Sequence, residues 1–188
     1  MPAMWPVAES ILNQWFNGMG EGGEDQSFGA DTASQIASAY DTAIKTASIV
    51  GKGNIVSGGV LIPSIESGFA ACFAQMASTP VDLSIVPYMS AAGGVVAAWA
   101  APIYIPVPPH PPCIAPVVGV QQIFPGAPMP LAVEIMDAFT QEDAAKIAPT
   151  LIKAFKNHMK QIMGIYLGLI PAVPSPIPGP PLPWVGVE

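Results

Sequence analysis

The chain has 188 residues, of which 51% are hydrophobic and only 10% are charged, and its net charge is −7. A soluble domain usually carries about 25% charged residues, so we expect part of the apolar surface to be covered by another protein or by lipid, and intrinsic disorder does not fit this composition. All six basic residues are lysines, and the lack of arginine together with the acidic balance argues against a protein that reads nucleic-acid sequence.

Proline is the second anomaly of the composition. It accounts for 23 of the 188 residues, more than twice its usual share of about 5%. We predict a mainly α fold, with a small helical body, long proline-rich extended arms and little regular β structure. The predicted segments are a helical one with glycine-rich loops (1–82), an uncharged apolar helix with a proline-rich extended part (83–130), C-terminal helices (131–170) and a proline-rich arm (171–188).

Hydrophobic spacing predicts three helices in the first segment. They cover residues 5–17, 32–50 and 63–78. Gly51 is expected to end the second helix, and Phe69 and Cys72 mark the buried face of the third. The connections are glycine-rich: an acidic loop at 17–30, and a loop or short hairpin at 51–62.

The second segment is defined by its lack of charge. No Asp, Glu, Lys or Arg occurs from Leu83 to Val133. Residues 87–101 are expected to form a helix of small residues, in which Gly93 and Gly94 would let another backbone approach closely. Residues 102–130 hold many prolines, so they are expected to be extended and cannot form a central strand.

Helical spacing resumes in the third segment. Residues 131–139 predict a short helix, and Thr140 is expected to cap a second one, with Asp143 completing a variant of the capping box. The spacing of apolar residues carries this second helix on to Tyr166, and Pro149 should kink or restart it.

The lysines of this last helix are expected on its polar face. They are Lys146, Lys153, Lys156 and Lys160, and His158 beside them is expected to be solvated. In the arm that follows, Trp184 and Val185 lie near the tip and suit an apolar anchor. Two alternatives stay open for the arm, which either binds a neighbouring subunit or folds back on its own domain.

No catalytic or metal template fits the sequence. His110 and His158 are the only imidazole bases, and no patterned nucleophile or carboxylate pair accompanies them. His110 and Cys113 could supply two metal ligands, whereas a structural zinc site needs four. Cys72 is expected to be a buried free thiol, although pairing with Cys113 stays open. We therefore expect no enzyme activity, no cofactor and no metal.

The pattern resembles small structural proteins of tailed-bacteriophage virions. The resemblance is carried by the uncharged tract from Leu83 to Val133 and by the proline-rich stretch from Pro174 to Pro181. It implies a virion protein, assembled in the host cytoplasm, of the tail, baseplate or neck and less readily of the capsid. It also implies a ring-forming homo-oligomer that binds copies of itself and other structural proteins, without specific binding of nucleic acid.

The expected subunit contacts are apolar or proline side chains of the uncharged and proline-rich segments. They are Trp99, Tyr104, Pro108, Pro112, Phe124, Pro178, Pro181, Trp184 and Val185. The alternative function is a membrane-associated protein, because residues 85–107 carry no charge and are long enough to span a bilayer.

Overall fold

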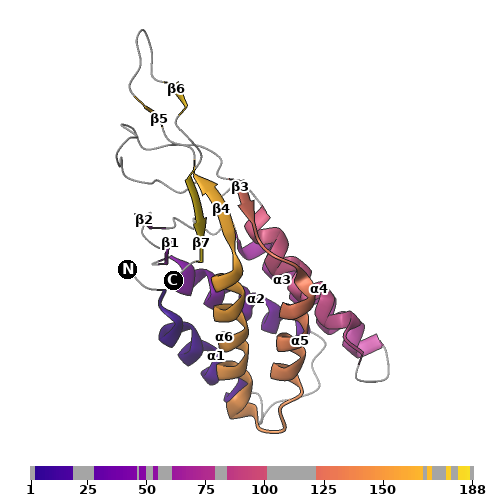
Figure 1. Ribbon diagram of the computed structural model, residues 1–188. Coiled ribbons are helices and arrows are strands. Elements are labelled where there is room, and N and C mark those ends of the chain that lie inside the picture. Colours follow the sequence, from indigo (N-terminus) through magenta and orange to yellow (C-terminus); the bar gives the residue numbers. More distant parts are fainter. Residues whose placement is uncertain are drawn as a thin grey trace.

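The computed structural model confirms a mainly α fold (Figure 1). It describes residues 3–18, 28–45, 47–49, 53–54, 61–78, 84–100, 122–166, 169–170, 177–178 and 182–186. The helices among these residues are α1 (Trp5–Gly18), α2 (Phe28–Ile44), α3 (Ile62–Ser78), α4 (Val86–Ala100), α5 (Pro128–Phe139) and α6 (Ala144–Gln161). They form a bundle, and a small sheet lies against one end of it.

The main sheet is antiparallel and has the strand order β3-β4-β7. Its strands are β3 (Gln122–Phe124), β4 (Met163–Tyr166) and β7 (Leu182–Val185). Two further strand pairs occur, β1 (Ser48–Ile49) with β2 (Gly53–Asn54) and β5 (Leu169–Ile170) with β6 (Ile177–Pro178). Pro183 lies in β7, which is an edge strand. Proline has no amide hydrogen, and an edge strand tolerates this because one of its sides makes no hydrogen bonds to another strand.

One hydrophobic core joins helices from three of the four predicted segments. Aromatic side chains run through it from helix to helix. Tyr40 of α2 packs edge-on against Phe155 of α6 with ring centroids 4.9 Å apart, and Phe155 lies 6.3 Å from Phe69 of α3. Phe73 of α3 in turn meets Phe139 of α5 at 5.4 Å. The segments that differ in composition therefore share a single packed interior.

The helices α3 and α4 approach each other through glycine, as the sequence predicted for residue 94. A Cβ atom built on Gly94 would lie 2.5 Å from the carbonyl oxygen of Ser64 and 2.8 Å from the Cα of Gly68. Gly93 has no neighbour within 4 Å of such a Cβ. Only Gly94 of the pair is thus required by the crossing.

The second helix ends earlier than its periodicity predicts. α2 covers Phe28–Ile44 instead of 32–50, and the chain then enters the short β1–β2 pair. Ile49 is β-branched and favours a strand, at a point where the apolar spacing still fits a helix. The alternative of a short hairpin within 51–62 therefore holds in part, since its second strand lies there.

The helix boundary at Thr140 also differs from the prediction. Thr140 is the C-cap of α5, and its hydroxyl donates to the carbonyl oxygen of Met136 at 3.0 Å. Asp143 is the N-cap of α6, where its carboxylate accepts from the amide of Ala145 at 3.0 Å. The predicted capping residue was wrong because a β-hydroxyl can also bond back to the preceding turn.

The last helix is shorter than predicted, and its end creates the sheet. α6 stops at Gln161, and the expected helical continuation to Tyr166 is instead strand β4. Pro149 lies inside α6, so the helix does not restart there. Gly164 weakens any helix at this point, and the flanking Ile165 and Tyr166 are strand formers.

Some predictions fall outside the described residues. They include the extended conformation of residues 102–121 and most of the arm from 171. In the described part of the predicted extended segment 102–130, β3 is extended, but α5 already begins at Pro128, because proline is tolerated in the first turn of a helix. Within the described ranges, no helix combines the length and apolarity needed to cross a membrane. The helical part of the 85–107 segment is α4, whose Val95 and Trp99 side chains lie in the core.

Candidate interaction surface

The nine expected contact residues separate into four groups. Trp99 lies entirely inside the chain's own core, so it is corrected from a surface contact to a packing residue. Phe124 and Val185 are exposed. The structure describes the backbone of Pro178 in β6 and of Trp184 in β7, without their side chains. Residues outside the described ranges are Tyr104, Pro108, Pro112 and Pro181.

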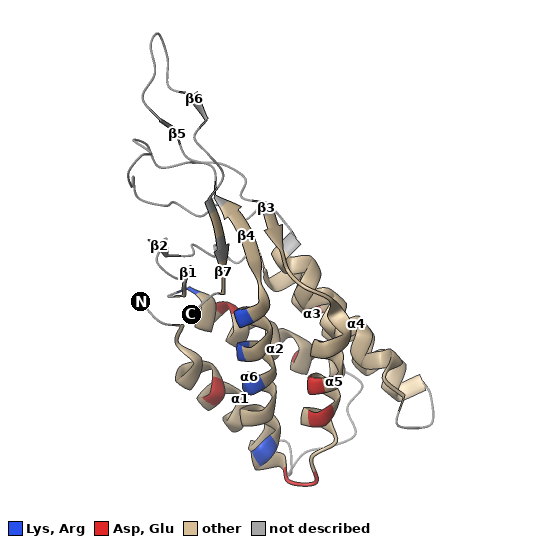
Figure 2. Ribbon diagram, in the orientation of Figure 1, with Lys and Arg blue, Asp and Glu red and all other residues tan. Residues whose placement is uncertain are grey.

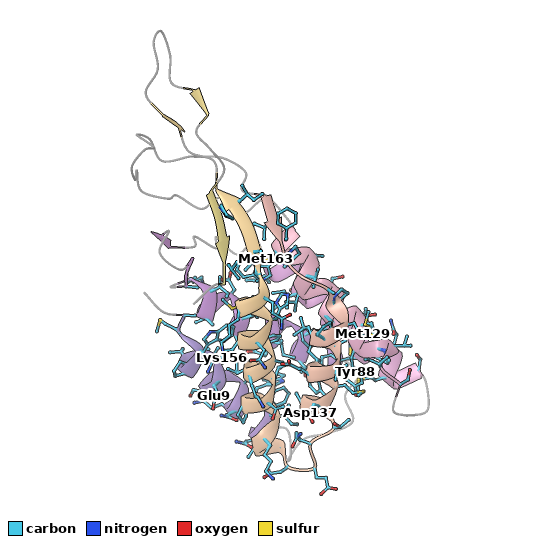
Figure 3. The ribbon with its side chains drawn as sticks, in the orientation of Figure 1. Glu9, Tyr88, Met129, Asp137, Lys156 and Met163 are labelled. Carbon is cyan, nitrogen blue, oxygen red and sulfur yellow. The ribbon has the colours of Figure 1, made fainter. Side chains whose placement is uncertain are left out.

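The two exposed residues belong to one row across the main sheet. Phe124 of β3 is paired with Met163 of β4, and Met163 is paired with Val185 of β7. Side chains of directly paired residues point to the same face of a sheet. Their exposed fractions are 42%, 48% and 60%, respectively. We call these three residues the apolar row; Figure 3 labels its central member, Met163.

The same face continues beyond the apolar row. Two residues further along their strands, Ile165 is half-buried and Pro183 is exposed, and the two are paired. The opposite face packs toward the helices, where Ile123 contacts the core and Gly164 is buried. An antiparallel sheet with one buried face usually has polar residues on the other. Here the outward side chains that the structure describes are apolar, while Gln122, which is paired with Ile165, is a polar residue at a register position on the same face.

Charge does not reach this sheet. The strands β3, β4 and β7 contain no Asp, Glu, Lys or Arg, and the chain has none at all from Gln161 to Val187. Figure 2 shows the charged residues on the helices, up to the end of α6 that leads into β4, and on the α5–α6 connection, with none on β3 or β4. The lysines of α6 follow its outer face, as predicted, and Lys146, Lys153 and Lys160 are exposed.

A second exposed apolar group lies on α5. Met129 and Val133 are four residues apart, so they share one face of the helix, and they are 51% and 46% exposed. Both come from the uncharged tract that the sequence singled out. Large exposed apolar side chains therefore recur between residues 124 and 185, on the strands and the first helix of this region.

The tip of the proline-rich arm folds back on its own chain in the described residues. β7 pairs with β4 along its whole length, from Leu182 opposite Tyr166 to Val185 opposite Met163. The amide of Gly186 extends the pairing by donating to the carbonyl oxygen of Ile162 at 2.8 Å. Of the two alternatives for the arm, this backbone follows the one within the chain, while the Val185 side chain still faces outward.

His158 is buried, which corrects the predicted solvated position. Its side chain is 4% exposed, and Nε2 lies 2.7 Å from the carbonyl oxygen of Pro125. The signal in the sequence was its spacing from Phe155 and Ile162, which places it on the apolar stripe of α6. The prediction of a solvated His158 relied instead on the neighbouring lysines, which lie on the polar face of the helix.

The described residues offer little for catalysis or metal binding. Cys72 is a buried free thiol, as predicted, and burial raises its pKa to about 12, so the reactive thiolate is disfavoured. No group of three or more metal-ligating side chains occurs within the described ranges. A shallow hollow of about 500 Å³ runs along the outer face of α1, lined by polar residues such as Glu9, Asn13 and Gln14.

The apolar row is thus the strongest candidate site that the structure presents. The sequence identified Phe124 and Val185 but missed Met163, because a helix was expected through that residue. Comparisons of the chain with protein-family models, with curated proteins and with solved structures each gave no match. The function must therefore be argued from the surface itself.

Proposed function

We propose that this chain is a non-enzymatic structural subunit of a large symmetric assembly, in which its copies bind one another through the apolar face of the main sheet. The observation that carries the proposal is the apolar row, where Phe124, Met163 and Val185 stand side by side on three strands and remain exposed. An exposed apolar patch on an uncharged surface is typical of a protein contact.

The surroundings of the row favour a protein partner over water or nucleic acid. The strands carry no charge, so no phosphate contact is offered by this face. The edge strands β3 and β7 are short, with three and four residues, and Pro183 interrupts the donors of β7. These features suit side-chain packing on the face of the sheet better than strand addition at its edges.

The resemblance to structural proteins of tailed-bacteriophage virions suggests the kind of assembly. We place the subunit in the tail, baseplate or neck, rather than the capsid, because arm-bearing helical subunits suit rings that join other rings. The proposed partners are copies of this chain and further structural proteins of the same virion. The proline-rich stretches would add contact area at small entropic cost, since proline limits the freedom lost on ordering.

The test is to make the row polar while keeping the strands. The variant combines Phe124→Thr, Met163→Thr and Val185→Thr, since threonine is a good strand former. Burying three half-exposed apolar side chains is worth about 3 kcal/mol in total, so we expect the dissociation constant of the oligomer to rise about a hundredfold. Light scattering coupled to gel filtration measures the oligomer, and circular dichroism checks the helices.

A matched variant changes exposed apolar residues elsewhere. It combines Met4→Thr, Val7→Thr and Val86→Thr on the helical body, all of which are exposed. This control should assemble as the native chain does. Equal loss of assembly in both variants, or unchanged assembly in the row variant, would refute the role proposed for the sheet face.

A further inference from the structure

His158 connects α6 to the end of β3. Its Nε2 lies 2.7 Å from the carbonyl oxygen of Pro125. A carbonyl oxygen can only accept, so Nε2 must carry the proton of this hydrogen bond. Pro125 directly follows Phe124, the last residue of β3. The imidazole therefore fixes the point where the strand leaves the sheet for α5.

The second ring nitrogen has a different environment. Nδ1 of His158 is buried and has no hydrogen-bond partner among the described residues. In the neutral ring this atom carries only a lone pair. In the protonated ring it would become a buried donor without an acceptor, and the ring would carry a charge in a desolvated position. The closed arrangement is therefore built for the neutral ring.

The surrounding charges do not favour a cationic ring. α6 packs mainly against α1 and α5, and its Phe155 also contacts α2 and α3. The charged residues of these five helices are Glu9, Asp31, Asp41, Glu66, Glu134, Asp137, Lys146, Lys153, Lys156 and Lys160. Glu134 accepts a hydrogen bond from Asn157 Nδ2 at 3.0 Å. In the described part of the chain, no carboxylate forms an ion pair with the imidazole.

We propose that His158 is a pH-sensitive latch: protonation of its buried Nδ1 at mildly acidic pH favours an open state in which the ring leaves its site, releases Pro125 and loosens β3, the strand that supplies Phe124 to the apolar row. The latch would operate in a single chain and does not depend on assembly. It couples the pH of the solution to the order of one edge of the sheet.

The direction of the effect follows from proton linkage. Burial is the larger influence and lowers the pKa of His158, while the hydrogen bond to Pro125 raises it. Above about pH 6.5 the ring is neutral in the closed and the open state, so the latch contributes fully. As the pH falls below that value, the open state binds a proton first, and opening becomes easier by up to about tenfold per pH unit until the closed-state pKa is reached.

Hydrogen–deuterium exchange of the full chain tests the latch. Protection of the peptide containing β3, corrected for intrinsic exchange, is measured at pH 7.5, 6.5 and 5.5. We expect it to fall by up to about tenfold between pH 6.5 and 5.5, while protection of α2 stays constant. In His158→Gln, where the side chain can still donate to Pro125 but does not titrate, the β3 protection should no longer depend on pH.

Two further measurements keep the outcome decisive. His110→Gln removes the other histidine of the chain and should leave the pH dependence of β3 intact. If His158→Gln does not fold, an NMR titration of the histidine rings in the native chain replaces it. A midpoint for His158 at or above pH 6.5, or the same pH dependence of β3 in His158→Gln, overturns the latch.

Discussion

Trp99 and Tyr40 form a buried pair that links α4 to α2. The indole Nε1 of Trp99 donates to the hydroxyl oxygen of Tyr40 at 2.6 Å, and neither side chain has exposed surface. Tyr40 also packs edge-on against Trp5, with ring centroids 5.8 Å apart. Burial raises the pKa of the Tyr40 hydroxyl, so the group stays neutral. A residue expected at a subunit contact thus stabilises the core.

Replacing Tyr40 by phenylalanine tests this pair. Tyr40→Phe leaves the Trp99 indole N–H buried without its acceptor, which should cost about 1–3 kcal/mol in the free energy of unfolding. Urea denaturation followed by circular dichroism measures the change.

The matching variants are Trp99→Phe and the double variant. Because the two side chains share one hydrogen bond, the loss in the double variant should be smaller than the sum of the single losses. Strict additivity would show that the bond contributes nothing to stability.

Side-chain burial could be predicted from the sequence only where spacing and chemistry agree. Phe69 and Cys72 are apolar at helical spacing, and both are buried as expected. His158 has the right spacing on α6 but a polar ring, and its partner is a carbonyl group 33 residues away in sequence. No local sequence pattern predicts a hydrogen-bond partner so far away in the chain. Trp99 was misplaced for the same reason, since Tyr40 lies 59 residues away.

The contact between α3 and α4 depends on backbone proximity. A Cβ atom on Gly68 would lie 2.7 Å from the Cα of Gly94. At that distance neither helix can gain a side chain without moving apart. The burial of the core residues that follow on α4, including Val95 and Trp99, depends on the same close crossing of the two helices.

Adjacent glycines of α4 offer a matched test of this crossing. Gly94→Ala should destabilise the fold by about 1–3 kcal/mol, because the new methyl group meets backbone atoms. Gly93→Ala should instead stabilise it by up to about 1 kcal/mol, since alanine is the better helix former and nothing obstructs its Cβ. Thermal unfolding of the two variants measures both signs. A destabilised Gly93→Ala together with a tolerated Gly94→Ala would contradict the helix packing.

Elements were easier to predict than their ends. All six described helices were predicted, although α4 was predicted from its small residues and not from apolar periodicity, and α1 and α3 differ from their predicted ranges by only one residue at an end. The end of α6 was missed because apolar residues alternate in β4 in a way that also fits a helical stripe. Pairing of β4 with β3 and β7 decides between the two, and those strands are remote in sequence.

At the scale of the whole molecule, the charged residues and the exposed apolar row occupy different regions (Figure 2). The low charge predicted an excess of apolar surface, and the structure locates part of it on the sheet. The location could not be predicted, because Phe124, Met163 and Val185 become neighbours only through strand pairing over tens of residues. Of these three residues, Phe124 and Val185 of the edge strands were among the expected contacts, and Met163 was not.

Sedimentation equilibrium of the native chain at micromolar concentration is the most direct test of the claim that copies of the chain cover this surface. The account predicts a species whose mass is a multiple of the 19.4 kDa of one chain, with association that survives raised salt because the contact is apolar. A single stable 19.4 kDa species across the concentration range would contradict it.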